Sequence, residues 1–173
     1  MAGSPIKLNL GCGPKHLQGF TNVDLAANWS GKRPDVEADA TKTLPFPENY
    51  ANEIHAYHFL EHIWRWKVDA VLMDWLRVLK PGGLLVLELP CLDKIIAAFS
   101  YYQQKKEPIE ERLTLWGLYG DPHYNSEEMT HKWCWSVGEL IDTLEKFGMK
   151  AELKDPQTHV AIRDMRIEAI KCQ

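Results

Sequence analysis

The stretch KLNLGCGP, residues 7–14, is a short apolar strand that runs directly into two glycines separated by one residue. Glycine permits a tight turn and lets backbone N–H groups approach a ligand without an intervening Cβ. In an open α/β sheet such a turn lies at the carboxyl end of a strand, where these sheets bind ligands. Because G-x-G also ends many ordinary strands, the residues that follow decide between a ligand site and a simple turn.

The next two strand ends each carry an acidic residue. Asp24 closes the strand 22–24, and a carboxylate at that place can accept hydrogen bonds from both hydroxyls of a ribose. Asp39 follows the weak strand 35–38 and can accept from an adenine amino group, while Ala40 leaves space for the ring. Taken alone, Asp24 is also read as a surface turn acid and Asp39 as a helix cap. In this order, the three signals favour a nucleoside-binding site.

Strand and helix patterns alternate through the first half of the chain. Strands are expected at 7–10, 22–24, 35–38, 53–57 and 84–89, and the spacing of apolar residues predicts a helix over 68–79. Lys80-Pro81-Gly82-Gly83 ends that helix abruptly. Such alternation predicts a parallel sheet with right-handed crossovers.

The second half changes character. Helices are expected at 93–102 and 137–147, and strands at 150–153 and 166–171. Because the connection between the last two strands is short for a crossover helix, we expect an antiparallel last pair. The whole chain, 1–173, is thus predicted to be one three-layer α/β/α domain, with an irregular substrate-side lid segment at about 101–135.

Composition limits the partners and the compartment. The 173 residues carry a formal net charge of -4, which argues against a protein that grips a nucleic-acid backbone. No apolar run is long enough to span a membrane, and the amino terminus has no apolar signal core. The cysteines are scattered, without C-x-x-C spacing, so we expect reduced thiols and a cytoplasmic location. They are Cys12, Cys91, Cys134 and Cys172.

Residues 7–90 resemble the class I S-adenosylmethionine (SAM)-dependent methyltransferases, more narrowly small members of the type-11 group. The matching elements are NLGCGP, NVDL, EADATKTLPFPENYANEIHAYHFLEHI and WLRVLKPGGLLVLELP, with a weaker match in HKWCWSVGELIDTLEKFGM. The resemblance implies a Rossmann-like, mostly parallel seven-stranded sheet with an antiparallel last strand, and SAM as the cofactor. It assigns Gly11 and Gly13 to the methionine end of SAM, Asp24 to the ribose, and Asp39 with Ala40 to the adenine. Residues Ala56, Tyr57 and His58 would flank the methionine and reacting end, and the expected cofactor site also includes Asn9, Leu10, Cys12 and Leu25.

Two features depart from the family pattern. Asn9 stands where the family usually has an acid, so it can accept a hydrogen bond from the SAM ammonium but adds no charge attraction. The interval from the glycine turn to Asp24 is also shorter than the roughly 20 residues of a full Rossmann-like unit. We therefore expect the first helix to be a stub at about 15–18, with Lys15 and His16 near the ligand. The short interval and the missing third glycine also disfavour a dinucleotide.

The segment 58–62, HFLEH, matches the H-x-x-E-H pattern of inverted zinc peptidases. The sequence offers no identifiable third metal ligand, and the motif falls where type-11 methyltransferases commonly read L-E-H. We therefore predict no metal site, with Glu61 and His62 as structural or pocket-edge groups.

Methyl transfer needs a general base only when the acceptor must lose a proton. His58 is the nearest candidate by motif position, followed by His131 and then His123, although a structural or exposed role stays open for each. Five aromatic residues of the second half either line an acceptor pocket or pack the lid. They are Trp116, Tyr119, Tyr124, Trp133 and Trp135.

The acceptor class follows mainly from what the sequence lacks. Nucleic-acid amino-methyltransferases of this fold carry an Asp/Asn-Pro-Pro-Tyr-like segment after the fourth strand, and this chain has no Pro-Pro pair. We therefore expect a small-molecule or glycan acceptor. A nucleic-acid methyltransferase and a non-catalytic SAM-binding protein are the alternatives, and the oligomeric state stays open.

Overall fold

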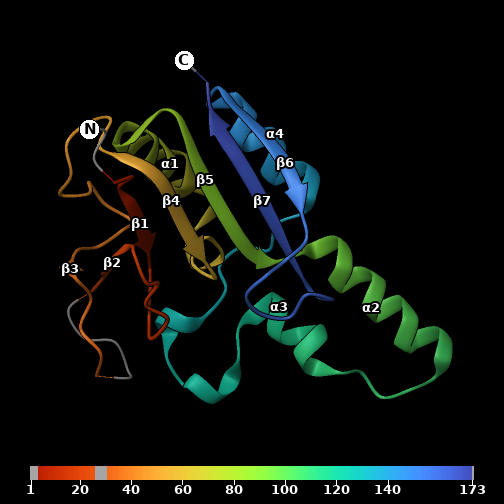
Figure 1. Cartoon of the computed structure of the whole chain (residues 1–173). Coiled ribbons are helices and arrows are strands. Elements are labelled where there is room, and N and C mark those ends of the chain that lie inside the picture. Colours follow the sequence, from red (N-terminus) through yellow and green to blue (C-terminus); the bar gives the residue numbers. More distant parts are fainter. Residues whose placement is uncertain (1–3, 26–30, 173) are drawn as a thin grey trace.

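The computed structural model describes residues 4–25 and 31–172, and its centre is a seven-stranded sheet of order β3-β2-β1-β4-β5-β7-β6 (Figure 1). Neighbouring strands from β3 to β5 pair in parallel, whereas β7 runs antiparallel to both β5 and β6. The strands are β1 Lys7–Leu10, β2 Thr21–Asp24, β3 Val36–Glu37, β4 Ala51–Tyr57, β5 Leu79–Pro90, β6 Met149–Lys154 and β7 Asp164–Lys171. The predicted mixed sheet with an antiparallel last strand is confirmed.

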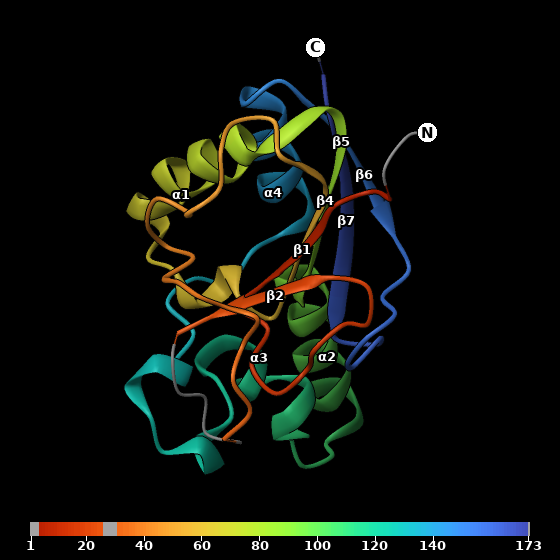
Figure 2. The same ribbon diagram turned by 60° about the vertical axis from the view of Figure 1, so that its left-hand side comes forward.

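Two long helices, α1 and α4, pack on the same face of this sheet (Figure 2). α1 buries Val68, Leu72 and Trp75 at helical spacing, and these side chains join the core formed by the apolar side of the strands. None of the described helices is long and apolar enough to cross a membrane. The α-helices are α1 Arg65–Val78, α2 Leu92–Lys105, α3 Leu115–Tyr119 and α4 Val137–Lys146, and the 3-10 helices are η1 Leu60–His62, η2 Glu111–Leu113, η3 Pro122–Tyr124 and η4 Glu127–Met129.

The opposite face of the sheet is polar. Because side chains alternate along a strand, Ile54 of β4 enters the apolar core while His55 and Tyr57 point the other way, where they hydrogen-bond each other at 2.7 Å. On the same face Glu88 of β5 meets Arg166 of β7 at 3.4 Å. Figure 2 shows loops on this side, so the flanking layer predicted there is formed by loops in the described residues.

The predicted helical stub at residues 15–18 is wrong, because residues 15–17 are irregular and a turn begins only at Gln18. Two buried amides hold its backbone instead. Asn9 donates from Nδ2 to the carbonyl of Lys15 (2.9 Å), and Asn22 accepts at Oδ1 from the N–H of Leu17 (2.8 Å). These side-chain bonds replace the backbone bonds of a helical turn.

The junction between α1 and β5 also differs from the expectation. The helix ends at Val78 as predicted within one residue, but the strand begins at once, at Leu79, rather than at Leu84. β4 pairs with β5 through Leu79 and again from Leu84, with a register shift between the two pairings. The Lys-Pro-Gly-Gly segment is therefore a bulge within the strand and not only a helix stop.

Candidate functional site

The glycine turn lies at the carboxyl end of β1, as predicted, and both glycines have a left-handed backbone. Gly11 and Gly13 have φ of 62° and 49°. A Cβ on Gly11 would lie 2.0 Å from a ring carbon of Phe59, so the aromatic ring at the exit of β4 requires this glycine. A Cβ on Gly13 would meet no described atom within 4 Å, so Gly13 faces the open side of the turn.

Asp24, at the end of β2, joins this turn. One carboxylate oxygen accepts the N–H of Gly13 at 2.6 Å and the other accepts the N–H of Leu25 at 2.7 Å. Each oxygen has two lone pairs, so each can still accept one hydroxyl proton. The acid therefore fixes the turn and, in the same position, presents two acceptors as a ribose diol requires.

Three residues of the expected cofactor site have interior side chains. Asn9 and Leu10 are buried, and the side-chain amide of Asn9 donates to the carbonyl of Lys15 and to Oδ1 of Asn22. Cys12 is also buried, and burial together with the nearby negative charge of Asp24 raises the pKa of its thiol to about 12. These residues shape the turn, and the thiol of Cys12 is unreactive at neutral pH.

Asp39 and Ala40 occupy the end of the β3 segment. The carboxylate of Asp39 accepts from the backbone N–H of Thr41 (2.9 Å) and pairs with Lys42 (3.1 Å). The carbonyl of Ala40 accepts from the indole N–H of Trp75 at 2.8 Å. Asp39 thus closes a local turn and does not cap a helix, and α1 anchors the adjoining backbone.

His58 follows β4 in a left-handed conformation, with φ of 49°, which is uncommon for a residue with a side chain. Its Nε2 lies 3.0 Å from Asp164 and its Nδ1 lies 3.1 Å from Glu61, and both carboxylates are buried. Burial opposes a charge on the ring, but the two carboxylates outweigh it and raise the pKa of His58 to about 9. An imidazole that already carries both protons cannot accept another, so this geometry favours a positioning role for His58 over a general base.

The contacts with His58 also keep the carboxylates of Glu61 and Asp164 ionised. Burial alone raises the pKa of a carboxyl group, but contact with His58 lowers that of Glu61 to about 2. His58 and Arg163 together hold the pKa of Asp164 well below its usual range. The exit of β4 is thus a buried, charged junction that links it to β7.

The other site residues predicted from sequence for this region lie in different surroundings. Ala56 is buried in the core, whereas the hydroxyl of Tyr57 bonds His55 on the polar face. His131 lies beside Glu61, with Nε2 3.9 Å from Oε1. His123 is exposed and pairs with Asp121 at 2.7 Å. The structure therefore brings His58 and His131 to the same carboxylate and leaves His123 at the surface.

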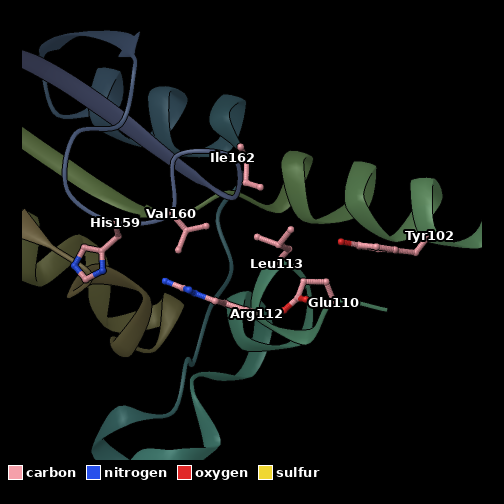
Figure 3. Close-up of a pocket in the computed structure, with 7 residues that line it drawn as sticks. All are labelled: Tyr102, Glu110, Arg112, Leu113, His159, Val160 and Ile162. Carbon is pink, nitrogen blue, oxygen red and sulfur yellow. The ribbon is translucent and has the colours of Figure 1, made fainter. Parts of the chain in front are cut away.

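A pocket of about 510 Å³ opens beside this junction (Figure 3). Arg112 reaches from the η2 segment toward Val160 and His159 of the β6–β7 connection, and Tyr102 projects from α2. The ring of His159 lies tilted against that of His58, with the ring centroids 4.0 Å apart. The lining residues are Tyr102, Glu110, Arg112, Leu113, His159, Val160 and Ile162.

Sequence reasoning missed the β6–β7 connection as a wall of this pocket, because no motif marks residues 155–163. Lys15 meets it through His159, with Nζ 2.9 Å from Nε2. Burial and the positive charges of His58 and Lys15 lower the pKa of His159 to about 4, so this ring is neutral at neutral pH. Lys15 thereby connects the glycine turn to the pocket.

The five aromatic residues considered for the acceptor site differ in burial. Trp135 is fully buried in the main core, whereas Tyr119 is 67% exposed. None of the five lines the pocket of Figure 3, whose aromatic wall is Tyr102.

Comparison with known proteins agrees with this geometry. Residues 8–87 match the family described as "Methyltransferase domain". The ubiquinone/menaquinone biosynthesis C-methyltransferase UbiE of Neisseria meningitidis serogroup B is 44% identical over 78 residues, which are 44% of this chain and 31% of the relative. UbiE of Azotobacter vinelandii is 47% identical over 72 residues, 38% of this chain and 27% of the relative. The chain thus matches about a third of the length of these curated relatives.

Solved structures match over almost the whole chain. A SAM-dependent methyltransferase from Methanosarcina mazei superposes with a TM-score of 0.63 at 17% identity, covering 99% of this chain and 94% of that one. The complex of DhpI with SAH gives a TM-score of 0.62 at 12% identity, covering 96% and 76%. At this identity the likeness shows the fold. Residues 8–87 thus match the methyltransferase-domain family in sequence, and nearly the whole chain shares the fold of solved SAM-dependent methyltransferases.

Proposed function

We propose that this chain transfers the methyl group of SAM to a small-molecule or glycan acceptor. The observation that carries the proposal is the hydrogen bond from the N–H of Gly13 to Asp24, which places the two carboxylate oxygens of Asp24 at the glycine turn on the carboxyl edge of the sheet. That edge is where ligands of open α/β sheets bind. The methyltransferase-domain match over residues 8–87 supports SAM as the ligand.

The residues present fit this cofactor in a defined order. The open side of Gly13 would receive the methionine end, Asp24 the ribose hydroxyls, and the Asp39–Ala40 backbone the adenine. Bound there, SAM supplies a methyl group on a positively charged sulfur, which needs only an in-line nucleophile. The protein's part is to hold the acceptor in line and to exclude water.

The acceptor would enter the pocket of Figure 3, next to His58 and His159. Its volume of about 510 Å³ suits a small molecule or one or two sugar rings. The planar guanidinium of Arg112 can donate two parallel hydrogen bonds, and the ring of Tyr102 offers a flat apolar surface. Together they suit a ring that carries acidic or hydroxyl substituents. The curated relatives are named for ubiquinone and menaquinone biosynthesis, so phenolic quinone precursors belong among the acceptors to test.

A second candidate is a SAM-binding protein without turnover. The observation that favours it is the state of His58, which is already protonated between Glu61 and Asp164 and so offers no base. This alternative predicts cofactor binding with no methylated product in any acceptor pool. A cytoplasmic location also stays a prediction.

The experiment that separates these functions is transfer of a tritiated methyl group from SAM to fractionated metabolites, glycans and nucleic acids. We expect label in the metabolite or glycan fraction, and its loss in Arg112→Ala with cofactor affinity unchanged. Tight SAM binding without labelled product would favour the non-catalytic protein. Label in nucleic acid alone would contradict the proposed acceptor class.

A further inference from the structure

Two neighbouring side chains and a third from far along the sequence point their ligand atoms at one another beside the exit of β4. Glu61 and His62 come from η1, and His131 comes from the segment after η4. One carboxylate oxygen and one nitrogen from each imidazole all lie within 4.8 Å of one another. Two histidines and a carboxylate form a donor set typical of divalent first-row transition metals.

The orientation of both imidazoles is fixed by backbone carbonyls. His62 Nδ1 lies 3.2 Å from the carbonyl of Thr130, and His131 Nδ1 lies 2.9 Å from the carbonyl of Gly117. A carbonyl only accepts, so each Nδ1 carries a proton, and the neutral form of each ring has its lone pair on Nε2. This outer contact, with Nδ1 on a carbonyl and Nε2 free to coordinate, is the usual arrangement of metal-binding histidines.

The carboxylate of Glu61 supplies the second, independent observation. The residue is 1% exposed, and neither oxygen accepts a well-aligned hydrogen bond in the described part of the chain. Its nearest charge is His58 Nδ1, at 3.1 Å from Oε1. A buried carboxylate with open lone pairs is costly, and a coordinated cation would use them.

We propose that Glu61, His62 and His131 form a binding site for one divalent transition-metal ion of the zinc type. Tetrahedral coordination at about 2.1 Å needs ligand atoms about 3.4 Å apart, and Oε1 of Glu61 already lies 3.9 Å from Nε2 of His131. A movement of about 1.5 Å or less closes the whole set. Three protein ligands leave a fourth position for water or for an oxygen of the acceptor.

The site differs from the one that the H-x-x-E-H pattern suggests. That pattern would pair His58 with His62, but His58 is held between Glu61 and Asp164. His131, which lies far along the chain, takes its place. This third ligand could not be identified from spacing, because only the fold brings it to η1.

The metal would fasten the substrate-side segment to the sheet. The N–H groups of Lys132 and Trp133 already donate to the carbonyl of Glu61, at 2.7 and 3.2 Å. A metal bound by His131 would add a strong link at the same place. The lid beside His58 would then be more rigid with the ion than without it.

The test uses the full chain without a purification tag, stripped with a chelator and titrated with Zn²⁺ by calorimetry and with Co²⁺ by visible absorption. We expect one ion per chain, with the intense bands of tetrahedral Co²⁺. His62→Ala and His131→Ala should each weaken the affinity by about 10–100-fold or more. His123→Ala, which removes an exposed histidine held by Asp121, is the matched control and should bind like the native chain.

Hydrogen exchange gives a readout of the link itself. Zn²⁺ should slow exchange of the amides of Lys132 and Trp133 in the native chain and not in His62→Ala. This variant should fold, because the side chain of His62 is partly exposed. Circular dichroism confirms folding of each variant. Absence of stoichiometric binding, or affinity that neither histidine substitution changes, would overturn the proposal. Both measurements are made without SAM, so they are independent of the proposed methyl transfer.

Discussion

Gly11→Ala is the substitution whose effect the structure defines most closely. The new methyl group would lie 2.0 Å from Cδ2 and 2.6 Å from Cγ of Phe59, a ring that packs 6.0 Å from Trp75. The ring cannot rotate out of the way cheaply, because it is partly buried and packs against the core. The matched control is Gly13→Ala, which has the same left-handed backbone but no described atom within 4 Å of the new Cβ.

The magnitudes follow from this difference. A left-handed backbone costs an alanine about 1–2 kcal/mol, partly offset by about 0.4–1 kcal/mol because alanine restricts the unfolded chain. We therefore expect Gly13→Ala to lower the free energy of unfolding by about 1 kcal/mol. Gly11→Ala carries the same cost plus about 1–3 kcal/mol for overpacking against Phe59.

Urea unfolding followed by tryptophan fluorescence measures both values. Adding Phe59→Ala to each variant completes the test, because removal of the ring should cut the cost of Gly11→Ala to that of Gly13→Ala. Equal costs for the two single variants would refute the reasoning. So would an excess cost of Gly11→Ala that persists without Phe59.

Further predictions concern the buried junction, the turn and the pocket. The folded pKa of His58, about 9, lies above its unfolded value, so its stabilisation is complete below about pH 6.5 and is lost as pH rises through 9. In chelated buffer, unfolding free energies of the native chain should therefore fall over this range and those of His58→Gln should not; parallel curves would contradict the ion pairs. Asn9→Asp removes the two Nδ2–H donors and should destabilise the chain by about 1–3 kcal/mol in thermal or urea unfolding, whereas an unchanged midpoint would argue against their role. Arg112→Ala should raise KM for the acceptor at least tenfold and leave SAM affinity unchanged in calorimetry, and an unaltered KM would move the acceptor elsewhere.

Periodicity and turn residues predicted most of the fold. The strand ending in Gly11-Cys12-Gly13 and the apolar spacing of 68–79 predicted β1 and α1 because local sequence decides both. The tight turn at Gly11 and Gly13 was expected for the same reason, and both residues have a positive φ. Elements that depend on distant contacts were harder to predict. At residues 15–18 the amides of Asn9 and Asn22 hold an irregular segment where a helix was expected.

The site was only partly predictable. Asp24 lies beside the glycine turn as expected, because parallel strands end at one edge of the sheet. The chemistry of His58 could not be read from its motif, since Asp164 approaches from β7, more than a hundred residues away. The same holds for His159 at the pocket and for His131 at Glu61, which only the tertiary fold brings together.

The placement of the ribose on Asp24 is the central claim, and calorimetry with SAM and its demethylated product SAH tests it most directly. We expect the native chain to bind both, and Asp24→Ala to bind more weakly by about 1–3 kcal/mol, the scale of lost hydrogen bonds to a charged group. Asp69→Ala, which removes an exposed acid on α1, is the control and should bind like the native chain. No binding by the native chain, or unchanged affinity in a folded Asp24→Ala, would contradict the account.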